Sequence, residues 1–490
     1  MTTSSPQEAA AENRQQHQQK GSQRQGALRG LLTSPVALMA LTIFIDFTGF
    51  GLILPLLPFW AEHFGADARA IGLLITVYAL AQLLFTPVLG GLSDRYGRRP
   101  IIITSLLIEV VGFALTALAG TLPLLLVARF VGGLGASNMG SAQAVVADVT
   151  SRVGRAKAMG AIGAAIGFGF VVGPALGGAL SAWGTAAPFW VAAALAVVNA
   201  LLVWRFLPET RGRRATAGAA TSSAASSTAP MRKRLTLVAG WGNLARNPAI
   251  ARLVTINLLY TLAFAGMESV FALLTQRQLG WGAVQNGYLF TYIGVIVVVM
   301  QGGLVGLLVK RFGERSLLVA GLMLLGVGLA LLPFGANLVI LLIGVSVLSL
   351  GDGAVTPTIS TLLSFASADE AQGATLGLAQ GLSSLGRMLG PLLAGVLFVI
   401  GAGLPFIAGA ALAALAVGLA LPALPGAQDH SAPAPGGASP PAASTDATTT
   451  PNAGSLLLAA APVRDVHSSR PGASQRQGEQ HQERTPSGVA

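Results

Sequence analysis

The stretch GGLSDRYGRR at residues 90–99 returns in altered form as GLLVKRFGER at residues 306–315. Long apolar runs lie on both sides of each copy, and about twenty apolar residues suffice to cross roughly 30 Å of hydrocarbon. A second pair of segments, GFVVGPALGG at 169–178 and GRMLGPLLAG at 386–395, stands at nearly the same separation. Two unrelated motifs repeated at matching separations predict a duplicated unit whose helices lie in a membrane.

The composition excludes a soluble protein of this length. Of the 490 residues 53% are hydrophobic and only 10% are charged, and the mean hydropathy is +0.67. Soluble proteins carry about 25% charged residues, which they need to cover their surface. The chain has no cysteine. Disulfides, thiol catalysis and thiolate metal sites are therefore excluded.

The apolar runs form two groups of six, separated by a polar segment. We predict spans at 36–57, 70–92, 101–120, 122–146, 158–181 and 186–206, and at 249–273, 284–309, 316–335, 338–363, 374–399 and 402–422. The fold class is therefore an all-α membrane protein with twelve transmembrane helices in two six-helix halves, 35–207 and 249–424.

Three polar segments flank these halves. The segment 208–248 is basic and rich in Ala, Ser and Thr, which predicts a flexible linker. The tails, 1–34 and 425–490, have too few apolar residues to fold, so we expect both to be disordered.

The positions of the basic residues predict the orientation of the chain. If the N-terminus is cytoplasmic, all but four of the 30 Lys and Arg residues fall on the cytoplasmic side; Arg69 and Arg277 lie opposite, and Arg129 and Arg387 lie within spans. Such a bias places both termini in the cytoplasm and the protein in the cytoplasmic membrane. The net charge of +11 then reflects topology and not nucleic-acid binding.

Four motifs resemble those of the major facilitator superfamily, and most closely its drug:proton antiporter branch, over about residues 36–424. They are DFTGFGLILPLLP at 46–58, the loop motif at 90–99, RFVGGLG at 129–135 and the glycine-rich segment at 169–178. The resemblance implies the major facilitator fold with parallel halves and substrate bound near the midplane. It also implies export of amphipathic, cationic or zwitterionic drugs in exchange for protons by alternating access. We expect no cofactor and no metal, and a monomer in the lipid bilayer.

The resemblance further implies roles for two of the motifs. In the loop motif, Asp94, Arg98 and the more distant Asp148 would form a charge relay that latches the two halves in the outward-facing state. Anchoring by positive charges would explain Arg98 and Arg99 but not Asp94. The full set of gating residues is Gly90, Asp94, Arg95, Gly97, Arg98, Arg99 and Asp148.

The second of these motifs carries glycines every four residues, which allow two helices to pack closely. The resemblance adds that this interface suppresses leak in antiporters. Pro174 bends the helix, and no phosphate loop is possible because no Lys-Ser or Lys-Thr follows. The motif residues are Gly169, Gly173, Pro174, Gly177 and Gly178.

Charged residues inside spans are costly and therefore functional candidates. Six meet this description: Asp46, Glu109, Arg129, Glu268, Asp352 and Arg387. All five histidines lie in tails or in the first outer loop, so proton coupling would have to use carboxylates. Removing a carboxylate from water disfavours its charged form.

We expect Asp46 and Glu268 to bind protons or a substrate cation, and Arg129 to reset Asp46 or Glu109. Glu109 and Asp352 fit a functional and a structural role equally well. Arg387 is expected in a structural ion pair.

Two other functions stay open at this point. One is export of an endogenous metabolite or sugar by the same fold, which the substrate range would distinguish. The other is a membrane-embedded enzyme or sensor. The lack of a catalytic His, Cys or metal cluster in the spans, and of a soluble domain, argues against an enzyme.

Overall fold

The computed structural model describes residues 34–150, 152–210, 247–367 and 372–421, and within these ranges every regular element is a helix. The N-terminal half contains α2 (Pro35–Ile53), α3 (Leu57–Glu62), α4 (Ala68–Tyr96), α5 (Arg98–Leu118), α6 (Leu122–Gly135), η1 (Ala136–Asn138), α7 (Met139–Val149), α8 (Arg152–Ser181) and α9 (Ala187–Phe206). The C-terminal half contains α12 (Pro248–Leu279), α13 (Ala283–Val299), η2 (Met300–Leu304), α14 (Val305–Leu331), η3 (Leu332–Phe334), α15 (Leu338–Ala366), α16 (Gln372–Ile400) and α17 (Leu404–Ala420). The two predicted tails and nearly all of the predicted linker lie outside the described residues.

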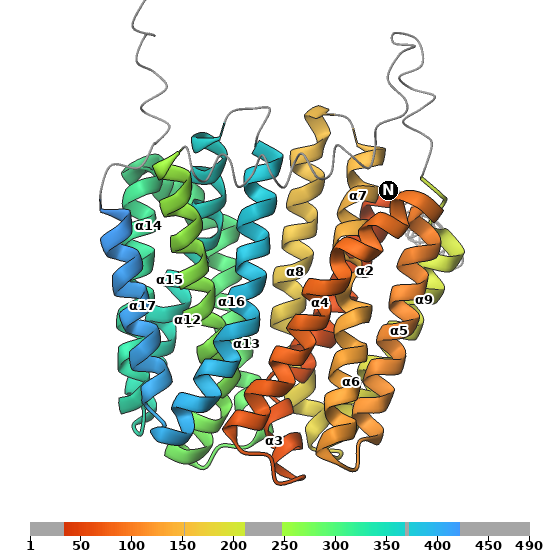
Figure 1. The fold of residues 1–490 in the computed structure, drawn as a ribbon. Helices are drawn as coiled ribbons and strands as arrows, with labels where there is room; N and C mark the ends of the chain where they lie inside the picture. The colour runs from red at the N-terminus through yellow and green to blue at the C-terminus, as the bar shows by residue number, and fades with distance from the viewer. Residues whose placement is uncertain (1–33, 151, 211–246, 368–371, 422–490) are drawn as a thin grey trace, which may run out of the picture. The chain divides into compact units, whose positions relative to one another are not determined.

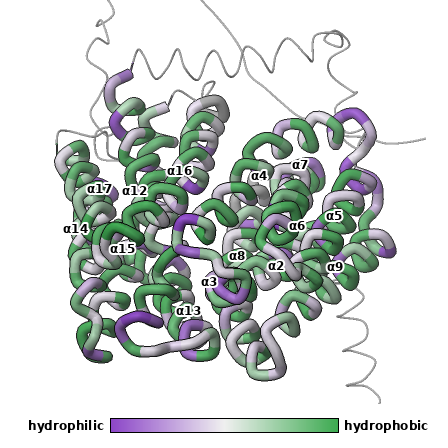
Figure 2. Tube along the Cα trace, turned by 60° about the horizontal axis from the view of Figure 1, so that its bottom comes forward, coloured by the Kyte–Doolittle hydropathy of each residue, from purple (hydrophilic) through white to green (hydrophobic). Residues whose placement is uncertain are grey.

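The helices have the composition of membrane spans. Ten helical stretches in the described ranges are long and apolar enough to cross a bilayer, when α6 to α7 and α13 to η3 are counted as one stretch each, and α17 is a shorter apolar helix. Hydrophobic residues extend along the helices, and hydrophilic residues gather mainly where helices end (Figure 2). The chain is a multi-pass, all-helical membrane protein.

Two predicted spans are interrupted where the sequence weakens the helix. The first span breaks between α2 and α3, because Pro55 has no backbone N–H and Pro58 starts the next helix. The fourth span narrows into the 3₁₀ turn η1 after three glycines in α6. This turn carries Asn138 and, as shown below, positions it beside α2.

The predicted spans 284–309 and 316–335 are two helices that meet at a kink at Gly313, inside the element labelled α14. A π-helical turn, η2, joins α13 to α14. Inside α14, Gly313 has φ 77° and ψ 160°, so the chain kinks at the glycine of the repeated loop motif. Only glycine adopts such a backbone conformation without strain.

Within each half, a glycine-rich helix packs closely on the first helix of that half. In the N-terminal half, a Cβ atom at Gly173 of α8 would lie 2.6 Å from the Thr48 carbonyl oxygen of α2. In the C-terminal half, a Cβ atom at Gly390 of α16 would lie 2.7 Å from the Leu262 carbonyl oxygen of α12. The two repeated segments therefore make equivalent contacts in the two halves.

The halves touch each other through α8 with α13 and α4 with α16. We call the end where α2 and α12 begin and α9 ends the linker end, uppermost in Figure 1, and the end with α3 the distal end. Near the distal end the backbones almost meet: a Cβ at Gly72 would lie 2.3 Å from the Pro391 carbonyl oxygen, and one at Gly287 would lie 2.6 Å from the Gly178 Cα.

Two side-chain hydrogen bonds also cross between the halves near the distal end. The Thr76 hydroxyl donates to the Met388 carbonyl oxygen at 2.8 Å, and the Gln276 amide donates to the Glu62 carboxylate at 3.0 Å. Toward the linker end of α8, a Cβ at Gly163 would meet no atom within 4 Å. The contacts between the halves named above therefore lie toward the distal end.

Candidate functional site

The carboxylate of Asp46 lies at the centre of a polar cluster in the N-terminal half. The side-chain amide of Asn138 donates to Asp46 Oδ2 at 3.1 Å, and that of Asn199 donates to Asp46 Oδ1 at 2.7 Å. Asn138 comes from η1 and Asn199 from α9, and both are buried. Neutral amides, and no cation, are thus the hydrogen-bond partners of Asp46 within the described residues.

Close glycine contacts place the neighbouring charged residues. A Cβ at Gly133 of α6 would lie 2.3 Å from the Tyr78 carbonyl oxygen of α4, and one at Gly135 would lie 2.6 Å from the Glu109 backbone nitrogen of α5. Helix α6 can therefore pack on both α4 and α5. As a result Glu109 is buried near Asp46, and the two carboxylates are close enough to repel each other when both are charged.

Arg129 does not pair with these carboxylates. Its guanidinium carbon lies 4.3 Å from the centre of the Tyr78 ring, a cation–π contact. Arg129 is 4% exposed, its Nε has no hydrogen-bond partner, and no ion pair involves it among the described residues. That Arg129 resets Asp46 or Glu109 remains a prediction.

An aromatic chain continues from Tyr78 towards α8. The ring of Phe50 lies 5.7 Å from that of Tyr78 and 5.9 Å from that of Phe170, and Phe47 lies 5.5 Å from Phe170. Phe47 and Phe50 come from α2, so these rings line the same helix as Asp46. The rings are tilted or edge-on to one another and form an aromatic, apolar cluster next to Asp46.

The C-terminal half carries a second acidic cluster. The Tyr260 hydroxyl of α12 donates a hydrogen bond to Asp352 of α15 and lies 2.9 Å from the Thr356 hydroxyl. Glu268 is near enough to Asp352 and Arg387 to interact electrostatically with both. Arg387 itself donates to Ser384 on its own helix at 3.0 Å. The expected structural ion pair of Arg387 is not found among the described residues, because its guanidinium bonds to a hydroxyl and not to a carboxylate.

The loop motif forms a charge relay within one half. Arg98 pairs with Asp94 at 2.7 Å and with Asp148 of α7 at 3.4 Å. All three residues belong to the N-terminal half. A latch across the two halves remains a prediction.

The last arginine of each loop motif has the same role in both halves. Arg99 donates to the Trp204 carbonyl oxygen at the end of α9, and Arg315 donates to the Leu421 carbonyl oxygen after α17. A cation beside the terminal carbonyls of a helix is favourable because those carbonyls carry partial negative charge. The duplication seen in the sequence thus extends to individual contacts.

Glu209 is a residue beside the loop motif that sequence reasoning missed. Its carboxylate accepts hydrogen bonds from the backbone nitrogens of Arg98 at 3.0 Å and Arg99 at 3.2 Å, at the start of α5. Gly97, with φ 109°, leaves room for it, since a Cβ there would lie 2.6 Å from Glu209 Oε2. Glu209, which follows α9 in the sequence, therefore caps the start of α5.

Replacing Glu209 with Ala should lower the free energy of unfolding by about 1 kcal/mol, because two backbone N–H groups lose their cap. The measurement is the thermal midpoint of the detergent-solubilised protein. Glu209→Gln retains a carbonyl acceptor and should lose less. Equal midpoints for Glu209→Ala and the unchanged protein would contradict the capping role.

The glycine-rich segment at 169–178 contacts its neighbours through two faces of α8. Gly169, Gly173 and Gly177 pack against α2, and Gly178 packs against Gly287 of the other half. Pro174 contacts Gly51, with its Cδ 3.1 Å from a Cβ placed there. The motif therefore lies where a helix pair inside one half meets the contact between the halves.

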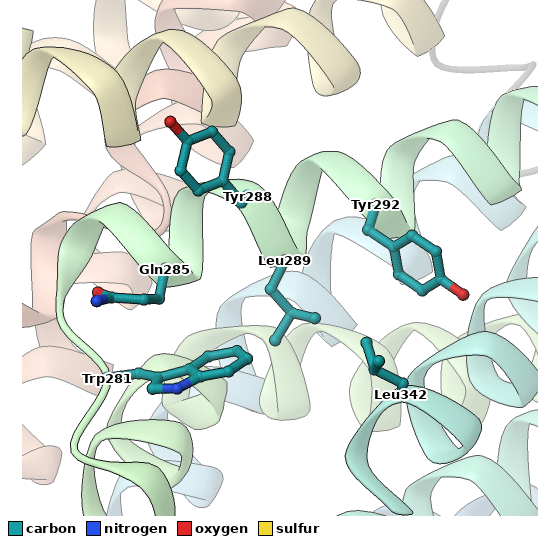
Figure 3. Close-up of a pocket in the computed structure, with 6 residues that line it drawn as sticks. All are labelled: Trp281, Gln285, Tyr288, Leu289, Tyr292 and Leu342. Atoms are coloured by element: carbon teal, nitrogen blue, oxygen red, sulfur yellow. The ribbon is translucent and has the colours of Figure 1, made fainter. Parts of the chain in front are cut away.

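A cavity of about 450 Å³ lies elsewhere, along α13 and the start of α15 (Figure 3). Its lining is formed by Trp281, Gln285, Tyr288, Leu289, Tyr292 and Leu342. None of the six charged residues predicted within spans lines it. This groove is therefore separate from both acidic clusters.

The partners of the predicted carboxylates were not predicted themselves. Asn138 and Asn199 bind Asp46, and Tyr260 binds Asp352. The signal in the sequence was an amide or a hydroxyl inside an apolar span, where an unpaired polar group is costly. That signal is shared by many residues, and only the packing of the helices selects these three.

Comparisons with known proteins agree with the architecture. A family model described as the Major Facilitator Superfamily matches residues 39–306 and 302–463. The class C tetracycline resistance protein of Escherichia coli is 32% identical over 380 residues, covering 76% of this chain and 92% of that protein. Multidrug resistance protein 1 of Bacillus subtilis is 29% identical over 389 residues, covering 79% of this chain and 95% of that protein.

Solved structures show the same fold. The human organic anion transporter MFSD10 superposes with a TM-score of 0.57 at 25% identity, covering 79% of this chain and 98% of that one. A bacterial homologue of the human lysosomal transporter Spinster, in an inward-facing conformation, gives a TM-score of 0.63 at 17% identity, covering 80% of this chain and 96% of that one. The relatives and the fold are those of transporters and not of enzymes. The chain belongs to the major facilitator superfamily.

Proposed function

We propose that this protein is a proton-coupled antiporter that exports amphipathic drugs across the cytoplasmic membrane by alternating access. In this proposal it has twelve spans, with the kinked stretch of α13 and α14 counted as two and α17 as the last. Both termini are cytoplasmic, so the linker end is the cytoplasmic end.

The observation that carries the proposal is the setting of Asp46. Its carboxylate lies within a span and bonds to two neutral amides, Asn138 and Asn199. A proton can therefore join it without breaking an ion pair in the described structure. Protonation removes its charge and with it the attraction for a cationic substrate. Proton entry and drug release would then be the same event.

The placement of the contacts between the halves supports alternating access. The contacts described above lie toward the distal end, so with the linker end open the clusters around Asp46 and Asp352 would face the cytoplasm. Closing the linker end and opening the distal end would expose the same residues outside. The relay of Asp94, Arg98 and Asp148 would act in that second conformation as the latch implied by the family.

The relatives support a drug as the cargo. Those named for tetracycline and multidrug resistance cover about three quarters of this chain. The aromatic chain of Phe47, Phe50, Tyr78 and Phe170 beside Asp46 would suit a flat, amphipathic cation.

Everted membrane vesicles test the proposal. Adding a substrate from a panel of tetracyclines, fluoroquinolones and lipophilic cations should collapse a preformed pH gradient, acid inside, in vesicles that contain the protein. Vesicles lacking the protein should keep their gradient. If no compound of the panel moves protons, drug:proton antiport is the wrong assignment.

The alternative is export of an endogenous metabolite by the same fold. Arg129, which has no carboxylate partner in the described residues, favours it, because a guanidinium could bind an anionic metabolite. Growth with a panel of drugs, compared with growth under metabolite overload, separates the two functions. The protein should confer tolerance to drugs only if it is a drug exporter.

A further inference from the structure

Asn199 is an unusual residue for its position. It lies in α9, a helix of alanines, valines and leucines that packs on the outer side of α2, and its side chain is 0% exposed. An amide in such a place is costly unless it is hydrogen-bonded. The hydrogen-bond partners of its amide therefore indicate the role of Asn199.

Both N–H groups of the Asn199 amide are used. Nδ2 donates to Asp46 Oδ1 at 2.7 Å and to the Thr42 carbonyl oxygen, one helical turn earlier in α2, at 3.1 Å. Asn138 donates to the other carboxylate oxygen at 3.1 Å. Each oxygen of Asp46 is thus held by an amide from a different helix, and one amide also ties α9 to the backbone of α2.

The carbonyl oxygen of Asn199 has no partner. Asn199 Oδ1 and the nearby Thr42 Oγ1 are both buried without a hydrogen bond in the described structure. The opposite orientation of the amide would set its oxygen against a charged carboxylate oxygen, two acceptors facing each other. The observed orientation therefore suits an ionised Asp46 and leaves one acceptor unused.

A protonated Asp46 reverses the requirement. The proton makes one carboxyl oxygen an O–H donor, which needs an acceptor. An amide carries both a donor group and an acceptor atom, so a half-turn of the Asn199 side chain would bring Oδ1 to that O–H. The same turn would withdraw Nδ2 from the Thr42 carbonyl oxygen and release the tie between α9 and α2.

We propose that Asn199 is a positioning residue whose amide turns when Asp46 is protonated. The turn breaks the hydrogen bond between α9 and the backbone of α2, so that proton binding on α2 changes how α9 is held. This inference rests on the proposed proton coupling through Asp46. Asn138 holds the second oxygen and keeps the carboxyl group in place while the amide turns.

Other titratable groups surround this pair without replacing it. Glu109 faces the region from α5 and Tyr78 from α4, with Arg129 of α6 stacked on Tyr78. None of the three donates a hydrogen bond to Asp46 among the described residues. The charged residues of α7, α8 and α9, which pack on α2, lie toward the linker end of those helices.

The first test reads the carboxyl group directly and needs no substrate. Infrared spectra of the purified full-length protein, recorded while the pH is varied, should contain a protonated-carboxyl band that Asp46→Asn removes. Asn199→Leu, which keeps the volume but neither hydrogen-bonding group, should shift this band. Asn286→Leu is the matched control, because Asn286 is also 0% exposed and its amide bonds to Gly282 and Thr275 and to no carboxylate.

The second test reads coupling. In everted vesicles, Asn199→Leu should lower drug movement driven by a pH gradient about tenfold relative to downhill drug movement, as expected for losing a hydrogen bond to a charged group. Asn286→Leu should leave this ratio unchanged, whatever its effect on the amount of protein. If Asn199→Leu does not fold, Asn199→Ser, which retains one small donor and acceptor, replaces it and should give a smaller change in the same direction.

The outcomes separate the two proposals. An unshifted carboxyl band in Asn199→Leu, or equal shifts in Asn199→Leu and Asn286→Leu, overturns the positioning role. So does an unchanged ratio in vesicles. A shifted band in a protein whose drug transport moves no protons would support the contact between Asn199 and Asp46 and would overturn the proposed function alone.

Discussion

Replacing Asp46 with Asn is expected to abolish the drug-induced collapse of a pH gradient in everted vesicles. Asparagine has nearly the same volume as aspartate but cannot bind or release a proton. It would also place an amide against the amides of Asn138 and Asn199, so at least one hydrogen bond would change. The loss should therefore be in coupling, while the amount of protein in the membrane stays close to normal.

Asp67→Asn provides the matched control for this experiment. Asp67 caps α4 near the distal end, accepting from the Ala70 backbone nitrogen at 2.9 Å, and asparagine caps helices equally well. This variant should transport normally. If Asp46→Asn also transports normally, Asp46 is not the coupling residue, and Glu109, Glu268 and Asp352 become the candidates.

A methyl group at Gly177 should strongly destabilise the protein. The Cβ of an alanine there would lie 2.3 Å from the Leu52 carbonyl oxygen, and the obstacle is backbone that no side-chain rotation can move. Helices α2 and α8 would have to separate along their shared contact. The expected cost is about 1–3 kcal/mol or more, as for other overpacked sites. The thermal midpoint in detergent measures it.

Gly163→Ala is the control on the same helix. No atom lies within 4 Å of a Cβ at Gly163, so alanine there should be neutral or slightly stabilising through its higher helix propensity. A similar loss of stability in both variants would mean that glycine flexibility, and not the close approach of α2, explains the motif.

Two neighbouring glycines of α8 contact different halves of the protein. Gly177 packs inside one half, so its contact should persist in every conformation of the transport cycle. Gly178 packs against Gly287 of the other half, a contact that must open if the distal end opens. In the proposed transport cycle, one ten-residue motif would thus serve both the folding of a half and the movement between halves.

Much of the architecture could be predicted from the sequence. Apolar runs of sufficient length predict helices that cross a bilayer, since an unpaired backbone polar group is costly there. The repeated segments at 90–99 and 306–315 predicted a duplication, and the matching contacts of Arg99 and Arg315 reflect it. The breaks at η1 and η2 were not predicted, because apolar segments of similar composition can form an α-helix, a 3₁₀ turn or a π turn.

The candidate site, like the fold, could be predicted from the sequence only in part. Asp46, Glu109 and Asp352 could be selected from the sequence because a charge inside an apolar span is rare. Their partners could not, and the stacking of Arg129 on Tyr78 was not predicted either. Which side chains meet depends on how helices far apart in the sequence turn their faces toward one another.

The sequence by itself determined that this protein is helical, duplicated and embedded in a membrane, since those properties follow from the hydrophobicity and spacing of residues along one helix at a time. Only the tertiary structure decided that Asn199 and Asn138 hold Asp46, that Tyr260 holds Asp352, and that Glu209 caps α5. Each of these contacts joins different helices, and a hydrogen bond forms only where packing brings donor and acceptor within about 3 Å.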